Sequence, residues 1–337
     1  MKIVYVASKY DYGIEERGFS FEHYNFYDTL QGMGHEIEYF DFLSLFHEFG
    51  RDRMSNMLRE VVDRVRPELM FTFLFTDQFD PRVLRKITEE TSTVTFNWFA
   101  DDHWRFENFS RHWAPCFTFV STTDSSAVAR YKAVGYDHAL LTQWGANPRV
   151  YVRRPGALRY IATFVGQSYG DRPAVIASLR KAGIDVQTWG ASWNLRRRHT
   201  VARRYKLMSA TKYQHIMDAT RITQSEMIDV FSASRINVNL SSSSQAGENQ
   251  IKGRNFEIPA CGGFQLSGYA AGLEKCFVPD EEIVCYRSTG ELVEKARYYL
   301  EHDEKRTAIA EAGYRRVMRD HTYEVRLAEL FRQMHLG

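Results

Sequence analysis

The sequence of 337 residues is poor in cysteine and has no long apolar run. Its four cysteines (Cys116, Cys261, Cys276 and Cys285) include no C-x-x-C pair, so neither a zinc site nor a dense disulfide framework is indicated. The apolar segment near the N-terminus, residues 3–7, is too short for a secretory signal, and no segment approaches the roughly 18 apolar residues of a membrane span. These absences predict a cytoplasmic protein in a reducing compartment.

An excess of charge of one sign is also missing. The chain has 44 Lys and Arg against 42 Asp and Glu, a formal net charge of +2, so no global field favours nucleic acid or an anionic membrane. Basic residues do concentrate between Arg196 and Lys206. This cluster could bind a polyanionic acceptor, nucleic acid or, peripherally, a membrane surface, or it could simply be a solvated loop.

Two glycine-rich fingerprints are absent as well. No apolar run is followed by G-x-G-x-x-G or by a Walker-type G-K-[ST], which argues against a dinucleotide dehydrogenase and a P-loop NTPase. The first turn contains only Gly13 and Gly18, and a later turn contains Gly166 and Gly170. The turn at Gly166 could be the edge of a nucleotide site or a plain strand-to-helix connection.

Aromatic residues, by contrast, are abundant at 14% of the chain, and they concentrate in the first 150 residues. There, strand-like apolar runs alternate with segments of helical spacing, of which residues 51–67 are the clearest. The runs lie at residues 2–7, 35–42, 68–75, 93–100, 116–121 and 139–145. Near-continuous apolar strands separated by helices predict an α/β, doubly wound domain with a parallel sheet.

The alternation lapses at residues 145–155, the predicted linker, and then resumes. Further strands are predicted at residues 159–166, 185–190, 235–240, 263–267 and 281–287. We therefore expect a Rossmann-like domain at residues 1–150, a second at 156–318, and a C-terminal helix at 319–337 that returns to the first domain.

The most informative stretch is NQIKGRNFEIPACGG, residues 249–263. Lys252 and Arg254 lie at a predicted helix start, where two cations and the helix dipole can neutralise a diphosphate. Glu257, one turn later, can accept hydrogen bonds from the vicinal hydroxyls of a ribose. The pattern indicates a nucleoside-diphosphate site, or otherwise an ordinary surface ion pair between Arg254 and Glu257.

Residues 160–330 resemble the C-terminal domain of the glycosyltransferase group 1 superfamily, in its CgeB-like branch. The motifs are R-x-F-E near a proline and a glycine pair, an E-E-I-x-x-Y strand, a Y-Y-L helix, and R-D-H-T-Y before the last helix. The resemblance implies the GT-B fold, two Rossmann-like domains facing across a cleft. It also implies metal-independent, cofactor-free transfer of a sugar from a nucleoside-diphosphate sugar, held by the second domain, to a hydroxyl acceptor on the first.

The resemblance also implies donor-binding residues. Glu257 matches the ribose-binding glutamate, Lys252 and Arg254 lie where the family has diphosphate-binding cations, and Phe256 belongs to the same R-x-F-E motif. The residues that match the loop approaching the diphosphate are Gly166, Gln167 and Arg172. From the residues alone, Trp189 could stack on a base or sugar, or it could pack in the core. Trp193 could likewise stack on a base or sugar.

One departure concerns the stereochemistry. Retaining members of the superfamily have an acid eight residues before the ribose-binding glutamate, where this chain has Asn249. The neighbouring Glu248 could restore the acid through a one-residue shift of the loop. The serines at 241–244 predict a loop that orders over bound nucleotide.

Candidate catalytic groups lie in the first half. Asp101 and Asp102 follow a strand, where Rossmann-like domains place their active groups, and either could deprotonate an acceptor or stabilise an oxocarbenium-like transition state. Asp101 could instead cap the next helix. His23, among aromatic neighbours on the first predicted helix, could be an acid–base group or a buried histidine, and His321 is expected to be structural.

The acceptor and the exact activity stay open on sequence alone. Aromatic residues at strand ends and loops could face the cleft, which favours a saccharide, aryl or lipid-linked acceptor; they are Tyr10, Tyr12, Trp98, Trp104 and Trp113. Two other functions are compatible with the pattern. They are a non-catalytic nucleotide-sugar-binding protein, which Asn249 permits, and a nucleotide-sugar epimerase of GT-B fold.

Overall fold

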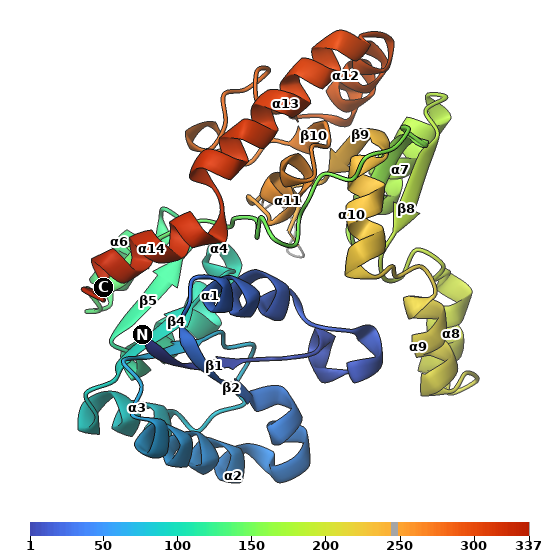
Figure 1. The fold of residues 1–337 in the computed structure, drawn as a ribbon. Helices are drawn as coiled ribbons and strands as arrows, with labels where there is room; N and C mark the ends of the chain where they lie inside the picture. Colours follow the sequence, from blue (N-terminus) through green and yellow to red (C-terminus); the bar gives the residue numbers. More distant parts are fainter. Residues whose placement is uncertain (244–248, 337) are drawn as a thin grey trace. The chain divides into compact units, whose positions relative to one another are not determined.

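The computed structural model describes residues 1–243 and 249–336. The chain divides into two compact units, Met1–Val150 with Thr322–Gly337 and Tyr151–His321. Each unit contains a parallel β-sheet flanked by helices (Figure 1). The doubly wound α/β architecture predicted from the alternation of strands and helices is therefore confirmed for both halves.

The first unit has a sheet with the strand order β2-β1-β3-β4-β5-β6 among the described residues. Its strands are β1 (Lys2–Ala7), β2 (Glu36–Asp41), β3 (Leu69–Thr72), β4 (Val94–Trp98), β5 (Phe119–Thr122) and β6 (Ala139–Leu141). Its helices are α1 (Asp28–Gly32), α2 (Phe42–Val65), α3 (Pro81–Glu90), α4 (Asp102–Arg105), α5 (Arg111–Trp113), α6 (Ala127–Ala133) and α14 (Tyr323–Gln333), with π-helical turns at His23–Tyr27 and Phe106–Ser110.

Helix α2 shows how the sequence pattern becomes packing. Met54, Leu58 and Val62 recur at helical spacing and are buried against one face of the sheet. Gly50 interrupts the helix with a positive φ of 77°, a conformation that glycine adopts without strain. The predicted helix at residues 51–67 is thus the second, longer part of α2.

The opposite face of the first sheet is covered by the end of the chain. Tyr323, Leu327 and Leu330 of α14 pack in one cluster with β1 and β3 side chains, including Tyr5. The Thr322 hydroxyl caps α14 by accepting a hydrogen bond from the backbone N–H of Val325 at 3.3 Å. Helix α14 therefore belongs to the first unit, although it follows the second in sequence.

The second unit has the strand order β11-β10-β9-β7-β8 among the described residues. Its strands are β7 (Tyr160–Val165), β8 (Val186–Trp189), β9 (Ser234–Asn239), β10 (Gln265–Gly268) and β11 (Val284–Tyr286). Its helices are α7 (Arg172–Lys181), α8 (Arg197–Arg204), α9 (Ala210–Asp218), α10 (Gln224–Ser232), α11 (Arg254–Ala260), α12 (Thr289–Glu301) and α13 (Asp303–Asp320). Helix α8 contains most of the basic cluster at Arg196–Lys206, so this stretch is helical and not the solvated loop that was one alternative from the sequence.

Both sheets place a crevice at the carboxyl ends of their strands. In the first sheet β1 lies between β2 and β3, and in the second β7 lies between β8 and β9. The strand order reverses at these points, so the loops that follow adjacent strands diverge, which is where doubly wound folds bind their ligands. No helix within residues 1–243 and 249–336 combines the length and apolar character needed to cross a membrane.

Candidate functional site

Two cations of the second unit meet where β7 and β9 end. Arg172, at the start of α7, is buried, and its guanidinium donates to the carbonyls of Gln167 at 3.1 Å and Ser242 at 3.2 Å. The Lys252 ammonium donates to the same Ser242 carbonyl at 2.7 Å and to the Tyr169 hydroxyl at 3.3 Å. Residues about 80 apart in sequence are thereby joined around one carbonyl. The arrangement forms a compact positive centre at the crevice.

A third cation, Arg254, lies close enough to influence this centre. Burial lowers the pKa of Arg172, and the positive charge of Arg254 lowers it further. The Nε atom of Arg172 is buried and has no hydrogen-bond partner in the described part of the chain. Neighbouring cations with an unused donor favour an anionic ligand, because the ligand would relieve their repulsion and satisfy the donor.

Arg254 covers the carboxylate of Glu257. Glu257 is fully buried, and its Oε2 atom pairs with the Arg254 guanidinium, which is itself 29% exposed. Burial alone would lower the pKa of Arg254, but the charge of Glu257 raises it above its ordinary value. The Oε1 atom of Glu257 is buried and without a hydrogen-bond partner among the described residues. The predicted pair exists, but it is not a surface pair, because the acid lies beneath the base.

Helix α11 is held in place by polar and aromatic contacts from below. The Asn255 amide donates to the Ser267 hydroxyl of β10 at 3.0 Å. Phe256 is fully buried and packs against Phe277 and His321, with ring centroids 5.6 and 5.3 Å away. Phe256 therefore supports α11 from the core, and His321, whose Nε2 lies 2.7 Å from a backbone carbonyl, has the structural role expected for it.

The turn after β7 is closely packed. A Cβ atom on Gly166 would lie 2.8 Å from the Phe164 ring, so a larger residue does not fit without a shift. The Gly166 carbonyl accepts a hydrogen bond of 2.8 Å from the Trp193 indole. Trp189 is half-buried and packs edge to face against Tyr160. Both tryptophans thus shape the wall behind the turn.

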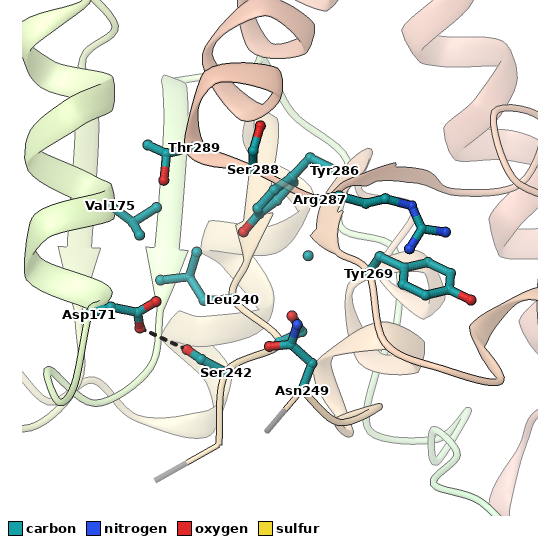
Figure 2. A pocket seen from close by; sticks show the side chains of 12 residues that line it. Asp171, Val175, Leu240, Ser242, Asn249, Tyr269, Tyr286, Arg287, Ser288 and Thr289 are labelled. Carbon is teal, nitrogen blue, oxygen red and sulfur yellow. Dashed lines mark hydrogen bonds between the residues drawn. The ribbon is translucent and has the colours of Figure 1, made fainter. Parts of the chain in front are cut away.

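A cavity of about 320 Å³ opens beside the cations, within the usual range for small-molecule sites (Figure 2). Ser242, whose carbonyl binds Arg172 and Lys252, lines it, and its hydroxyl donates to Asp171 at 3.0 Å. Other polar lining side chains come from the ends of β10 and β11 and the start of α12; they are Tyr269, Arg287, Ser288 and Thr289. Figure 2 shows Arg287 beside Tyr269. The Arg287 guanidinium carbon lies 3.5 Å from the centroid of the Tyr269 ring.

The cavity also includes Asn249, the position at which retaining relatives have an acid. Glu248 and Ser244, which the sequence analysis considered as a substitute acid and as part of a mobile loop, lie outside the described residues. Tyr269 and Arg287 were not predicted as site residues. The available signal was their position directly after β10 and β11, since ligands bind at the carboxyl ends of parallel strands.

The two neighbouring acids of the first unit, Asp101 and Asp102, differ in how deeply they are buried. Asp102 is fully buried, and the Tyr131 hydroxyl donates to its Oδ2 at 3.0 Å. Burial raises the pKa of Asp102 above its ordinary value. Asp101 is half-buried, and its carbonyl, not its side chain, accepts the first hydrogen bonds of α4. The geometry therefore favours Asp101 over Asp102 as a group that meets an acceptor.

His23 lies within an aromatic stack. Its ring is stacked between Phe19 and Tyr27, with centroids 4.1 and 4.8 Å away. Burial and the nearby charge of Lys9 lower its pKa to about 4, so the imidazole is neutral at pH 7. A neutral, stacked histidine fits a packing role, and the neighbouring Glu22 lines a cavity instead.

The aromatic residues expected to face a cleft also differ in how deeply they are buried. Trp98 is fully buried and Trp113 is 9% exposed, so the prediction that they present their rings to a ligand is wrong. Tyr10 and Trp104 are half-buried, whereas Tyr12 is 47% exposed. The ends of β4 and of α5 thus contribute tryptophan to the core, because the surrounding helices cover them.

Over the part of the chain that the structure describes, no group of three His, Cys, Asp or Glu side chains is arranged to hold a metal ion. The cations at the candidate site come from the start of α7, from the loop before α11 and from the start of α11. Such a site is suited to binding an anionic ligand directly.

Comparison with known proteins relates this site to a family. Residues 172–332 match the family model described as glycosyl transferase-like. Spore protein CgeB of Bacillus subtilis is 22% identical over 230 residues, which are 65% of this chain and 68% of that protein. The matched region contains α11, all three cations and every lining residue of the cavity except Asp171.

Solved structures share the fold over nearly the whole chain. Sucrose-phosphate synthase from Thermosynechococcus elongatus superposes with a TM-score of 0.64 at 12% identity, covering 99% of both chains. Anabaena Alr3699/HepE in complex with UDP has a TM-score of 0.60 at 11% identity, covering 98% of this chain and 100% of its own. The protein thus has the GT-B fold, and its residues 172–332 are similar to the glycosyl transferase-like family.

Proposed function

We propose that this protein transfers a glycosyl group from a nucleoside-diphosphate sugar to a hydroxyl acceptor without a metal ion. The observation that carries the proposal is the convergence of Arg172, Lys252 and Arg254 at the carboxyl ends of β7 and β9. HepE, which shares the fold, has been solved with UDP and with UDP-glucose. A diphosphate is the donor group that would neutralise such a centre.

The donor would be divided between the cations and the adjoining cavity. The planar arginine forks suit paired phosphate oxygens, and Lys252 adds a compact point charge. A volume of about 320 Å³ next to Ser242 leaves room for the sugar or the base. The cations would also stabilise the charge that develops on the departing diphosphate. A metal ion has this role in other transferases.

Glu257 would bind the ribose only after Arg254 moves. In the structure the guanidinium covers the carboxylate. A diphosphate that attracts Arg254 would uncover Glu257, and the ribose hydroxyls would then replace the lost hydrogen bonds. The unused Oε1 atom of Glu257 supports this exchange. Donor recognition would therefore couple two contacts through one arginine.

A thermal-shift screen of UDP, GDP, dTDP and CMP sugars tests the proposal. A ligand at a hundred times its dissociation constant stabilises by about 2.7 kcal/mol, so a true donor should raise the melting temperature clearly. Arg172→Met should abolish most of the shift, whereas Lys181→Ala, an exposed cation on the same helix, should leave it unchanged. No shift with any nucleotide would refute the donor assignment, and a shift abolished by EDTA would refute metal independence.

The products separate the proposal from its alternatives. A transferase should release free sugar slowly from the donor in the absence of acceptor, because water can replace the acceptor hydroxyl. A pure nucleotide-sugar binder would release none, and an epimerase would change the sugar without consuming an acceptor. We place the reaction in the cytoplasm, which is supported by four cysteines that form no disulfide bond.

A further inference from the structure

The first unit has a cavity of its own at the point where its strand order reverses. It lies at the carboxyl ends of β1 and β3 and measures about 180 Å³. A buried apolar cavity of about 150 Å³ is known to hold one benzene molecule, so this cavity accommodates a single six-membered ring. Its position is the one at which doubly wound sheets bind ligands.

Most of the cavity wall is aromatic or aliphatic. The residues are Tyr12, Phe21, Phe42, Leu43, Phe73 and Phe75. Tyr12 and Phe75 are 47% and 43% exposed and contact each other edge to face at 5.7 Å. Tyr12 adopts a left-handed backbone conformation with φ of 55°, which is strained for a non-glycine residue. Exposed rings held in this way remain available to a flat apolar ligand.

The polar part of the wall contains two carboxyl groups, Asp11 and Glu22. Glu22 is half-buried just before the π-helical turn His23–Tyr27, and the Tyr5 hydroxyl donates to its backbone carbonyl at 2.9 Å. Burial, with a smaller effect from Asp11, raises the pKa of Glu22 to about 7. A carboxyl group with this pKa can take up a proton near neutral pH, as a general base must.

The distribution of polar groups selects the class of ligand. A sugar ring has hydroxyls around its whole edge and would need polar partners on every side. The apolar wall and the nearby carboxyls suit a ring with one hydroxyl at its edge. We propose that this cavity binds the acceptor through a hydroxylated aromatic ring and that Glu22 holds the reacting hydroxyl and accepts its proton.

This inference rests on the proposed glycosyl transfer and completes its chemistry. The acceptor oxygen forms a bond to the anomeric carbon, and the bond from that carbon to the diphosphate oxygen breaks. The nucleoside diphosphate leaves with the electron pair, and the hydroxyl proton passes to Glu22. No other reactant is needed.

The pH dependence follows from the groups around Glu22. Asp11 faces it from the first loop, and Tyr5 of β1 and Tyr39 of β2 interact with it electrostatically. Burial raises the pKa of both tyrosines, so neither ionises near neutrality, and His23 beside it has a pKa of about 4. Glu22 is therefore the group expected to titrate near pH 7. Below that pH it is protonated and cannot accept a proton.

The experiment compares the wild type with three variants. Glu22→Gln removes the base, Phe75→Ala removes an exposed wall ring, and Glu16→Gln is a control at an exposed acid of the preceding 3-10 turn, Glu15–Arg17. Transfer is followed by mass spectrometry with 4-methylumbelliferone as the aryl acceptor and methyl glucoside as the polar one. The donor is whichever of UDP-, GDP- and dTDP-glucose stabilises the wild type most. Donor binding and donor hydrolysis are measured in parallel for every variant.

Glu22→Gln should lower kcat for the aryl acceptor about 100- to 10,000-fold and remove the decline of kcat/KM below pH 7, with donor binding unchanged. Phe75→Ala should raise KM with little change in kcat, and Glu16→Gln should match the wild type. Transfer by Glu22→Gln at the wild-type rate, or a preference for methyl glucoside, would overturn the inference. Failure of every donor to bind the wild type would instead refute the proposed function itself.

Discussion

Glu257→Ala should destabilise the second unit measurably, because it leaves the charge of Arg254 without its partner. Glu257 is fully buried, and the Arg254 side chain also makes a long hydrogen bond of 3.4 Å to the Val165 carbonyl. Removing one member of a buried ion pair costs about 3–5 kcal/mol. Because Arg254 is 29% exposed, water offsets part of the loss, and we expect a cost near the lower end, about 3 kcal/mol.

For a unit of this length, about 3 kcal/mol corresponds to a fall in Tm of about 6–12 °C, measurable by circular dichroism or calorimetry. The double variant Arg254→Met with Glu257→Leu removes both charges at similar volume and should recover most of the loss. Glu329→Ala is the control, because Glu329 pairs with Arg332 at the same i,i+3 spacing on an exposed surface. It should cost less than about 1 kcal/mol.

The same variant separates ribose binding from diphosphate binding. Glu257→Ala frees Arg254, so pyrophosphate should bind at least as tightly as to the wild type. UDP should lose affinity, by a few kcal/mol at most, because its ribose hydroxyls no longer find a carboxylate. Isothermal titration calorimetry measures both. A Tm within about 1 °C of the wild type would contradict the buried-pair argument, and equal affinities for UDP would contradict the ribose assignment.

Three further predictions concern the first unit. Asp101→Asn should lower turnover with donor binding intact, whereas Asp102→Asn should chiefly change stability; full activity of Asp101→Asn would refute its assignment. Because burial raises the pKa of Asp102, its contribution to stability is fully present below the ordinary carboxyl pKa and is lost as the pH rises through the raised value. In urea unfolding experiments, the free energy of unfolding of Asp102→Asn should therefore fall less than that of the wild type as the pH rises over that range. The same pH dependence in both proteins would contradict this. Leu330→Ala in α14 should cost about 2–5 kcal/mol, since this side chain is 1% exposed, and Val325→Ala, which is 41% exposed, should cost under about 1 kcal/mol.

The strands could be predicted because buried parallel strands are apolar along their whole length. Each predicted apolar run overlaps an observed strand, from KIVYVA in β1 to the run around β11. Helix α2 could be predicted from the spacing of Met54, Leu58 and Val62. These features depend on neighbours in sequence, so the pattern alone is sufficient.

The donor residues could be proposed from the sequence, but their arrangement could not. Lys252, Arg254 and Glu257 are adjacent in the chain, and their spacing indicates a diphosphate site. That Arg172 shares a carbonyl with Lys252 depends on the pairing of β7 with β9. Spacing also cannot show that Glu257 lies beneath Arg254 and not beside it on the surface.

The contrast between His23 and Glu22 shows what could not be predicted from the sequence. By residue type, a histidine on the first helix is the better candidate for acid–base chemistry. The tertiary structure stacks His23 between aromatic rings and places Glu22 on a cavity wall, where burial raises its pKa to about 7. The sequence by itself determined two doubly wound sheets and a cationic motif, because strands, helices and motifs are local. Burial decided which groups can react, because it depends on side chains that only the folded chain brings together.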